Sequence, residues 1–568
     1  MKYTKHDTMT TPYMERLEGS IPWTDYPRPS MVRDSYLSLN GKWDFATEAE
    51  GNAPDFNEKI LVPFPPESLL SGIERSIPSG TVIYYRRSFT LPEGFVRDRV
   101  LLHFGAVDTL CCVYVNGAKA ICHEGGYLPF YADITELLKQ GENVVEVHVR
   151  DDLDKKYPYG KQKRDRGGMW YTPVSGIWQS VWLESVCTGR IEKILTTPTL
   201  HSVKVKVVGG NGSYRLTLDD GKVYEWSGDS TEIEIDEPKL WTPDSPTLYH
   251  YTLESGNDKV RSYFALRNVG TAVKDGIPRL TLNGEPYLFV GPLDQGYFPD
   301  GIFLPPTSEG YADDILNMKA MGFNMLRKHI KVEPEIFYYL CDKLGIAVFQ
   351  DMVNNSGYSF LIDTALPTLG LKRLCDKHRH RNKESRRIFL EHARATVEHL
   401  YSFPSVVYYT IFNEGWGQFC ADNAYEKFKA WDPTRIIDST SGWFTAKKSD
   451  VDSRHVYFKK IKLGRRTEKP IVISEFGGYA YRMPCHVYGD RYYGYKLFQS
   501  EGELEDAVIS LFADEIAPLI PLGISGLVYT QLSDVEDETN GLITYDRRHT
   551  KVNSERIAEV IMRLRRLI

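Results

Sequence analysis

The sequence has little cysteine and no long apolar run. Its 568 residues include eight cysteines but no Cys-x-x-Cys pair, which argues against a zinc finger and against a disulfide scaffold. No run of about eighteen apolar residues occurs, and the start, MKYTKHDTMTTPYMERLEG, lacks the continuous apolar segment of a signal peptide. We therefore expect reduced, mostly buried thiols and a cytoplasmic protein with no membrane partner.

Basic residues are not in excess either. Lys and Arg total 69 against 76 Asp and Glu, a net charge of −7, which disfavours a nucleic-acid partner. No Gly-rich turn follows an early strand, so a dinucleotide-binding fold is not indicated and we expect no cofactor. The segment DKHRHRNK, 376–383, holds two histidines, but its lysines and arginines would repel a cation, so we expect no metal.

Aromatic residues are abundant, at 12% of the chain, while 42% of residues are apolar and 26% are charged. Such a composition supports packed cores, and Tyr and Trp also suit sites that bind the apolar face of a sugar. At roughly 150 residues per domain, the length predicts about three or four domains.

The first stretch, 1–188, reads as short antiparallel strands. NVVEVHVR places Val145, Val147 and Val149 on one face, the period-2 pattern of a half-buried strand. Asn116-Gly117 between β-rich arms predicts a tight hairpin turn. We predict a jelly-roll β-sandwich here. The next stretch, 189–271, has shorter, more polar strands with frequent turn signals, which predicts a small immunoglobulin-like β-sandwich.

From residue 272 to 568 the pattern changes to alternating strands and helices. Eight strands are predicted, followed in several cases by amphipathic helices, which favours a C-terminal TIM (β/α)8 barrel over a doubly wound sheet. The predicted strands are 287–293, 324–329, 347–352, 406–414, 435–441, 454–458, 471–476 and 526–534. The predicted helices are 311–321, 334–344, 384–401, 421–430, 503–517 and 553–566.

Two carboxylates end predicted strands four and seven of this barrel. Glu414 lies in IFNEGWGQF and Glu475 in IVISEFGGYA. Active sites of TIM barrels lie at the carboxyl ends of the strands, so both side chains should reach one mouth. Paired carboxylates are what glycosidic cleavage requires, one to protonate the leaving oxygen and one to meet the cationic centre. Alone, each motif is also compatible with an ordinary turn.

The chain as a whole resembles glycoside hydrolase family 2, the β-galactosidase, β-glucuronidase and β-mannosidase family. The segments that carry the resemblance are LNGKWDF, YYRRSF, VYVNG, DITELLKQGENVVEVHV, SGIWQSVWLE, YFALRNV and LTLNGEPYLFVG, together with the two glutamate motifs. The resemblance implies a retaining, exo-acting β-glycosidase with Glu414 as acid/base, Glu475 as nucleophile and Asn413 bound to the sugar. It implies a carbohydrate substrate, and a homo-oligomer is possible.

Further side chains are candidates for substrate binding because they lie near predicted strand ends or could face a sugar ring. They are Arg327, His329, Asp351, Trp416, Trp443, His455, Tyr457, Tyr479 and Gln531. Structural histidines and core aromatics are the competing interpretation. The acidic DVEDE, 534–538, is expected either in a solvated loop or bound to a hydroxyl or cation.

The chain departs from the family pattern at the ends of strands one and eight. Strand one runs into GPLDQGYFPDG, and Gln531 stands near the usual aromatic of strand eight. Glu538 and Asn540 occupy positions where β-glucuronidases of the family carry an Asn-x-Lys motif, and an acidic side chain should repel a uronate. We therefore expect a neutral hexose, galactose first.

Other functions stay open at this point. A β-glucuronidase or β-mannosidase of the same family is the nearest alternative. A non-catalytic carbohydrate-binding protein would keep the folds but lose turnover. A barrel aldolase or phosphate-binding enzyme would need a Schiff-base lysine or a Gly-rich loop after strand seven, where Glu475 stands instead.

Overall fold

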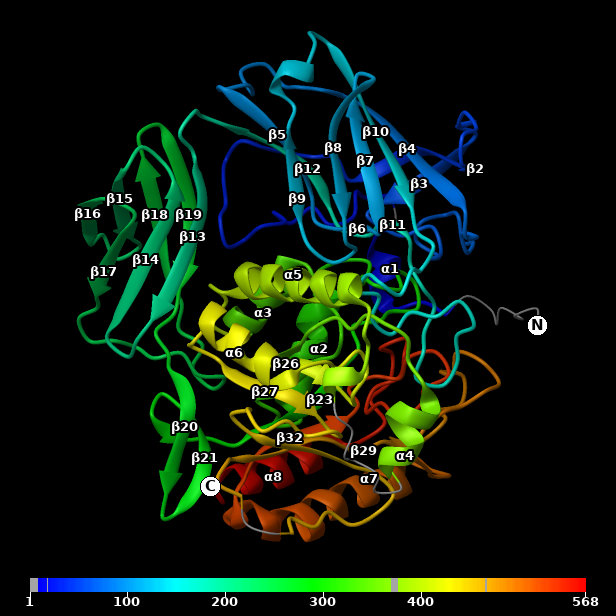
Figure 1. The fold of residues 1–568 in the computed structure, drawn as a ribbon, viewed down its shortest axis with the longest axis vertical. Coiled ribbons are helices and arrows are strands. Elements are labelled where there is room, and N and C mark those ends of the chain that lie inside the picture. The colour runs from blue at the N-terminus through cyan, green and yellow to red at the C-terminus, as the bar shows by residue number, and fades with distance from the viewer. Residues whose placement is uncertain (1–8, 18, 369–375, 465–466) are drawn as a thin grey trace.

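The computed structural model describes residues 9–17, 19–368, 376–464 and 467–568. It shows two β-sandwiches and one barrel, in the predicted order along the chain (Figure 1). The predicted boundary at 188/189 lies between the two sandwiches, and the one at 271/272 lies within a strand that begins the connection to the barrel. Among the described residues, no helix is long and apolar enough to span a membrane.

The N-terminal sandwich packs a six-stranded sheet on a four-stranded one. The larger sheet has the order β3 (Glu58–Val62), β2 (Gly41–Ala49), β4 (Thr81–Thr90), β10 (Glu142–Arg150), β7 (Leu110–Val115), β8 (Ala118–Glu124). The smaller has the order β1 (Tyr36–Ser38), β12 (Val181–Val186), β5 (Arg99–Phe104), β9 (Phe130–Asp133), and β6 (Val107–Asp108) pairs with β11 (Gly176–Ile177). As predicted, Val145, Val147 and Val149 are buried on alternate positions.

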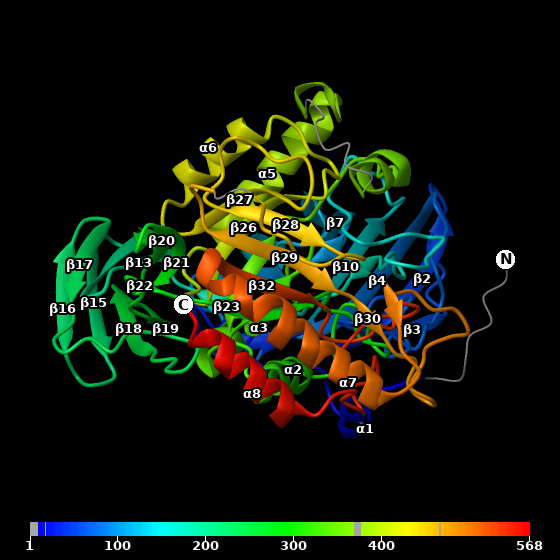
Figure 2. The same ribbon diagram turned by 90° about the horizontal axis from the view of Figure 1, so that it is seen from below.

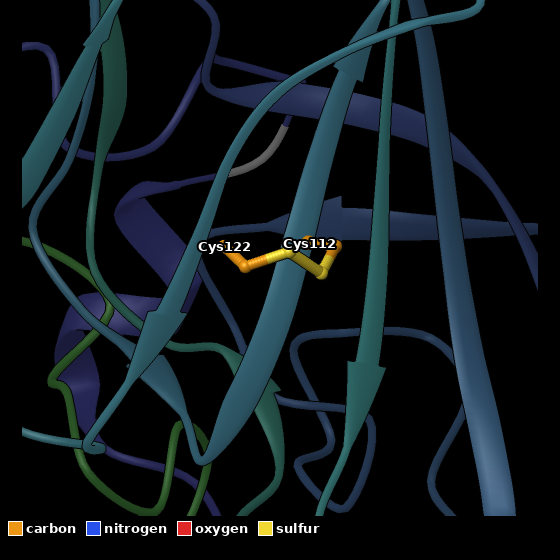
Figure 3. Close-up of a disulfide and its surroundings, with 2 residues drawn as sticks. All are labelled: Cys112 and Cys122. Carbon is orange, nitrogen blue, oxygen red and sulfur yellow. A yellow bond between two sulfur atoms is a disulfide. The ribbon is translucent and has the colours of Figure 1, made fainter.

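One pair of cysteines in this sandwich is oxidised. Cys112 on β7 and Cys122 on β8 are opposite each other in the ladder, with Cα atoms 4.1 Å apart, and a disulfide joins them (Figure 3). The prediction of reduced thiols is wrong here, because the turn at Asn116 and Gly117, both with positive φ, sets the two side chains on one face. The expected cytoplasmic location thereby loses its cysteine argument. The free cysteines among the described residues are Cys111, Cys187, Cys341, Cys420 and Cys485.

The middle domain is a smaller sandwich of two antiparallel sheets. One has the order β13 (Ile191–Pro198), β14 (Ser202–Gly209), β17 (Ser230–Glu234). The other has the order β16 (Val223–Ser227), β15 (Ser213–Leu218), β18 (Tyr249–Ser255), β19 (Asp258–Phe264). Its core is aliphatic and aromatic, with Leu216, Leu253 and Val260 fully buried.

The third part is a parallel eight-stranded barrel, as the alternating pattern predicts. Its strands are β23 (Phe289–Asp294), β24 (Met325–Lys328), β25 (Ala347–Asp351), β26 (Val406–Asn413), β27 (Ile436–Ser441), β28 (Asp452–Val456), β29 (Ile471–Gly477) and β32 (Ile524–Thr530). The first strand pairs with both the second and the eighth, as in a barrel and unlike a doubly wound sheet. The fifth and sixth strands, β27 and β28, lie next to each other but share no hydrogen-bonded ladder. Figure 2 shows β28, β29 and β32 running side by side in one direction.

Helices cover the barrel unevenly. They are α2 (Glu309–Ala320), α3 (Glu335–Leu344), α4 (Leu366–Thr368), α5 (Lys383–Leu400), α6 (Ala421–Trp431), α7 (Glu501–Ser510) and α8 (Ser554–Arg565). Shorter turns accompany them, π at Phe360–Ala365 and Leu511–Ile516 and 3-10 at Asp376–His378 and Ala517–Leu522, while the 3-10 turn Thr135–Leu137 belongs to the N-terminal sandwich. Helix α1 (Pro12–Arg16) and the short strands β30 (Tyr479–Ala480) and β31 (Lys496–Leu497) lie outside this pattern. The described residues between β27 and β29 form no helix, which leaves this side of the barrel to loops.

A hairpin and the middle domain join the barrel at one hydrophobic cluster. The hairpin consists of β20 (Val269–Lys274), β21 (Ile277–Leu282) and β22 (Glu285–Pro286). Leu280, Leu282 and Trp241 pack with inward-facing barrel residues such as Phe349 and Val472. Burial of this much apolar surface fixes the middle domain against the barrel.

Arg267 reinforces this junction. It is 1% exposed, and its guanidinium donates to the carbonyl oxygens of Pro404 and Val406, each at 2.9 Å. Burial, followed by repulsion from Arg435, lowers the pKa of Arg267 to about 9. The barrel therefore uses a buried cation to satisfy carbonyl groups at the start of β26.

We predict that Arg267→Met lowers the free energy of unfolding by about 1–3 kcal/mol, because the buried Pro404 carbonyl loses its donor, while the Val406 carbonyl keeps the one from Arg435. Arg215→Met is the control, since Arg215 pairs with Glu225 in solvent and such pairs contribute less than about 1 kcal/mol. Urea denaturation followed by tryptophan fluorescence measures both. Equal midpoints for the two variants would contradict the assigned role of Arg267.

Candidate active site

The two candidate carboxylates lie at the carboxyl ends of the fourth and seventh barrel strands, β26 and β29. Glu414 follows Asn413, the last residue of β26, and Glu475 lies within β29. The Glu475 side chain is 7% exposed and that of Glu414 is 15% exposed. Glu475 is therefore the more buried of the two and Glu414 the more accessible, although both face the same mouth of the barrel.

The backbone conformation after Glu414 requires the two glycines of the Gly-Trp-Gly sequence. Glu414 has a φ of 51°, and Gly415 and Gly417 follow with φ values of 75° and 68°. A Cβ on Gly415 would lie 2.3 Å from the Phe444 ring, so no larger residue fits there. Three left-handed residues in this short turn lift the Glu414 side chain off the strand direction.

Arg327, on β24, links four strand ends. Its Nε donates to Asp351 Oδ1 at 2.9 Å, Nη1 donates to Glu475 Oε1 at 3.1 Å and to the Ser474 carbonyl at 2.9 Å, and Nη2 donates to Asn413 Oδ1 at 2.8 Å. The planar guanidinium can meet all these acceptors at once because its donors radiate in a fixed plane. The Nδ2 group of Asn413 has no hydrogen-bond partner among the described residues.

The surroundings of Glu475 favour its ionised form. Burial raises the pKa of Glu475, but the charges of His455, Arg327, His329 and Lys161 outweigh it and lower the pKa below its usual value. The Tyr457 hydroxyl also donates to Glu475 Oε2 at 2.8 Å. A carboxylate held negative in this way is suited to nucleophilic attack.

His455, on β28, connects the two carboxylates. Its Nδ1 lies 2.8 Å from Glu414 Oε1 and 3.5 Å from Glu475 Oε2. Its Nε2 lies 2.8 Å from Ser441 Oγ, and the Ser441 hydroxyl donates to Ser474 Oγ. Ser441 must therefore accept from His455, so Nε2 carries the ring proton and Nδ1 shares one proton with Glu414.

The distance between the carboxylates fits one stereochemical class. One oxygen of Glu414, one oxygen of Glu475 and a nitrogen of His455 all lie within 4.8 Å of one another. Retaining glycosidases separate their carboxyl groups by about 5–5.5 Å, whereas inverting enzymes need about 6.5–9.5 Å to admit a water. The spacing is compatible with direct attack by Glu475.

His329 and Asp351 form a second layer behind Glu475. His329 Nδ1 lies 2.6 Å from Asp351 Oδ2, and both side chains are buried. Burial lowers the pKa of His329, while Arg327 and His329 overcome burial to lower the pKa of Asp351. Asp351 thus stays negative and holds Arg327 in place.

Among the described residues, the one group of side chains that could together hold a metal ion is Glu414, His455 and Glu475. Glu414, His455 and Glu475 offer two oxygens and a nitrogen at suitable mutual distances. Arg327 already occupies Glu475 Oε1, and a guanidinium this close disfavours a bound cation. That no metal is needed stays a prediction.

A cavity of about 1150 Å³ opens beside Glu414. Its wall includes His455, Tyr457 and the predicted Trp443, whose ring centre lies 5.6 Å from that of His455. Tyr457 stacks on Tyr495 with ring centres 3.8 Å apart. This space is wide enough for a substrate to reach the carboxylates.

Two predicted residues lie elsewhere. Trp416 packs edge-on against Tyr159 and Trp170 of the N-terminal domain and donates from Nε1 to the Ser356 carbonyl, so it joins two domains. Tyr479 lies on β30 with its ring 5.3 Å from that of Phe498. Neither belongs to the cavity wall that contains Glu414, because the backbone turns away after each glutamate motif.

Gln531 belongs to a buried polar wall after β32. Its Oε1 accepts from Gln295 Nε2 at 2.9 Å. The Nε2 of Gln531, the Oε1 of Gln295 and the Oδ1 of Asn540 are buried and have no hydrogen-bond partner in the described part of the chain. Buried amides without partners are rare in folded proteins, and here they offer donors and acceptors to a ligand.

The acidic segment 534–538 is not a solvated loop. Asp534, Glu536 and Glu538 are each at most 3% exposed. Glu538 accepts from the Tyr171 hydroxyl at Oε2 and from Asn540 Nδ2 at Oε1. Burial raises the pKa of Glu538, so the negative charge expected to repel a uronate is weakened by its surroundings.

Lys161 is a site residue that sequence reasoning missed. It comes from the N-terminal domain and is 9% exposed. Its backbone carbonyl accepts from Tyr171, but its ammonium group makes no hydrogen bond or ion pair with the described residues and lies 5.8 Å from the centre of the Trp170 ring. Its charge nevertheless acts on Glu475, Glu538 and His329. No periodic signal in GKQKRDRGG connects this loop to the barrel, so only the folded structure reveals the contact.

Comparisons with known proteins agree with this architecture. The model described as "Glycosyl hydrolases family 2, sugar binding domain" matches residues 72–186, "Glycosyl hydrolases family 2" matches 195–267, and "Glycosyl hydrolases family 2, TIM barrel domain" matches 307–517. Each match falls on one of the three parts of the structure.

Relatives with two different activities are similar to the chain. A β-galactosidase of Thermoanaerobacter pseudethanolicus is 27% identical over 297 residues, covering 48% of this chain and 39% of the relative. A β-glucuronidase of Rattus norvegicus is 24% identical and covers 88% of both chains. The chain spans less than half the length of the first curated relatives, 39%, 45% and 43%.

Solved structures share the fold. A β-D-glucuronidase of Dictyoglomus thermophilum superimposes with a TM-score of 0.73 at 20% identity, covering 95% of this chain and 98% of the other. A β-galacturonidase of Eisenbergiella tayi bound to galacturonate has a TM-score of 0.69 at 19% identity, covering 96% and 99%. Because three domain models of one family match in order along a chain with this fold, the protein belongs to glycoside hydrolase family 2.

Proposed function

We propose that the protein is a retaining, exo-acting β-glycosidase that releases a terminal sugar by double displacement. The observation that carries the proposal is the pair Glu414 and Glu475, with oxygens within 4.8 Å and His455 hydrogen-bonded to the first. The surroundings of the two carboxylates differ, since Glu475 is kept ionised, while Glu414 is the more accessible group and is hydrogen-bonded to His455.

The first step breaks the glycosidic bond. Glu475 attacks the anomeric carbon, and Glu414 gives its proton to the departing oxygen, so that an alcohol leaves and a glycosyl ester forms. Arg327 and Tyr457 hold the Glu475 carboxylate at both oxygens, which leaves it little freedom to rotate. Asn413, oriented through its Oδ1 by Arg327, presents Nδ2 to the sugar.

The second step returns the enzyme to its starting state. Glu414, now ionised, takes a proton from water, and the resulting oxygen nucleophile attacks the anomeric carbon to displace Glu475. Each step inverts the configuration, so the product keeps the configuration of the substrate.

A β-galactoside is the first candidate substrate. After strand eight the sequence has Glu538 and Asn540 in place of the Asn-x-Lys motif, and several relatives are named β-galactosidase. The buried amides of Gln295, Gln531 and Asn540 suit the hydroxyls of a neutral hexose, because they combine unpaired donors and acceptors.

A β-hexuronide is the second candidate, and Lys161 favours it. The Lys161 side chain is largely buried and its ammonium group has no ion pair with the described residues, so a sugar carboxylate would supply it with a counterion. Other relatives are named β-glucuronidase, and the galacturonidase of Eisenbergiella tayi binds galacturonate. Lys161 would then bind the sugar carboxylate in place of the lysine of the Asn-x-Lys motif that β-glucuronidases of the family carry.

The roles of the two carboxylates are tested by substitution. We expect Glu475→Gln to lower kcat by at least about 10⁴-fold on aryl glycosides. Glu414→Gln should lower kcat/KM by about 10²–10⁴-fold for poor leaving groups and much less for dinitrophenyl, which leaves without protonation. A 2-fluoroglycoside should label Glu475, as located by peptide mass spectrometry. A label on another residue, or a wild type that binds sugar and turns nothing over, would overturn the assignment.

The pH dependence of kcat/KM tests the hydrogen bond from Tyr457. This bond stabilises the ionised Glu475, so Tyr457→Phe should raise the pKa of Glu475. The acidic limb of the profile then moves to higher pH, and kcat/KM at the optimum falls by about tenfold. Tyr84→Phe, in the N-terminal sandwich, is the control. An unmoved acidic limb in Tyr457→Phe would show that Glu475 does not govern it.

The second candidate substrate makes a prediction for Lys161. On 4-nitrophenyl β-glucuronide, Lys161→Met should lower kcat/KM by about 100-fold, because a bound carboxylate loses its cation. The loss on 4-nitrophenyl β-galactoside should be much smaller. Lys163→Met, an exposed neighbour in the same loop, is the control. Wild-type hydrolysis of the galactoside but not of the glucuronide would decide for the first candidate.

A further inference from the structure

The large cavity lies on the leaving-group side of the candidate active site. Glu414 and His455 form part of its wall, but Glu475 does not belong to the described residues that line it. In the proposed mechanism, on which this inference rests, Glu414 protonates the oxygen that joins the sugar to its leaving group. The space next to Glu414 and away from Glu475 therefore receives the leaving group.

The wall of this cavity is mainly apolar and aromatic. Its rings include Phe360, Trp443, Phe444, Phe458 and Tyr495. Phe458 is 76% exposed and Phe360 is 67% exposed, and Leu361 beside Phe360 is 62% exposed. Exposed apolar side chains that gather around one cavity, unlike single ones scattered over a surface, mark a place that binds an apolar partner.

The two ends of the site differ in polarity. Lys161, Gln295, Gln531 and Asn540 bring charge and unpaired amides to the buried region linked to Glu475 through Glu538. The leaving-group cavity has no Asn or Gln among the described residues that line it. We therefore assign the polar region to the sugar and the aromatic cavity to the leaving group.

A second sugar would find few carboxylate or amide acceptors in this cavity, whose other polar side chains include hydroxyls such as those of Thr445 and Ser453. Sugars bound to aromatic rings also need side chains that accept their hydroxyl protons. Apart from Glu414, the carboxylate in the described wall is Asp452, and it pairs with Arg454 at 2.6 Å. Exposed lysines at 459, 460 and 462 complete the rim and offer no acceptor.

We propose that the leaving group is an apolar aglycone with aromatic rings, bound between Phe360, Phe458 and Trp443. The cavity, at about 1150 Å³, exceeds the roughly 300–1,000 Å³ of typical small-molecule pockets, so it admits a polycyclic aglycone. The reaction is unchanged: the bond from the anomeric carbon to the aglycone oxygen breaks, that oxygen receives the Glu414 proton, and a phenol departs.

The test compares two substrates with the same sugar, galactose or glucuronic acid, whichever the wild type hydrolyses. The β-glycosyl fluoride has a leaving group too small to touch the rings, and the 4-methylumbelliferyl β-glycoside has a bicyclic one. Phe458→Ser should lower the ratio of kcat/KM for the umbelliferyl substrate to kcat/KM for the fluoride by about tenfold, through a higher KM. Phe360→Ser should act in the same direction.

Val273→Ser is the matched control, because Val273 is 69% exposed on β20, far from the cavity in sequence and outside its wall. It should leave the ratio unchanged. Phe458 is exposed, so its substitution should not prevent folding, which circular dichroism checks. An unchanged ratio in both Phe variants, or a higher kcat/KM for a β-linked disaccharide than for the umbelliferyl glycoside, would overturn the proposal. If the wild type hydrolyses neither substrate, the proposed function itself fails, which is a separate result.

Discussion

The buried guanidinium of Arg327 is the interaction on which the site depends. It fixes Asp351, Asn413 and Glu475, which come from three further strands, and the nearest of these contacts are 2.8–2.9 Å long. Charges as buried as these are tolerable only when each is paired and hydrogen-bonded. A substitution at any one of these residues therefore disturbs the others. The position of the proposed nucleophile follows from the register of β24, β25, β26 and β29.

The N-terminal sandwich completes a site that the barrel alone would leave open. Lys161 and Tyr171 belong to its last loop and reach Glu538, while Trp170 packs on Trp416 just after the acid/base candidate. Under the proposed function, a domain that reaches this site would influence which sugar is accepted without altering the chemistry.

The periodicity of the sequence was sufficient to predict the barrel. It was not sufficient to predict the whole site, which depends on contacts between residues far apart in the sequence. Each of the eight strands was predicted within a few residues, because buried parallel strands are nearly continuous apolar runs. Glu414 and Glu475 were brought together by that topology. Lys161, the burial of 534–538 and the Cys112–Cys122 bridge were missed, since each depends on which loop or strand face meets another. Trp416 was placed near the right glutamate but on the wrong side of its turn.

His455 couples the two carboxylates electrostatically, because its Nδ1 lies close to an oxygen of each. While Glu475 is negative, the proton between His455 Nδ1 and Glu414 Oε1 is held in a region that carries this charge 3.5 Å from the imidazole. When Glu475 becomes an ester, that negative charge disappears and Arg327 loses a counterion. Both changes favour a negative Glu414, which is the form required to activate water. In the proposed mechanism, the covalent step itself thus converts the acid into the base, and the buried cation that positions the nucleophile also drives the exchange of roles.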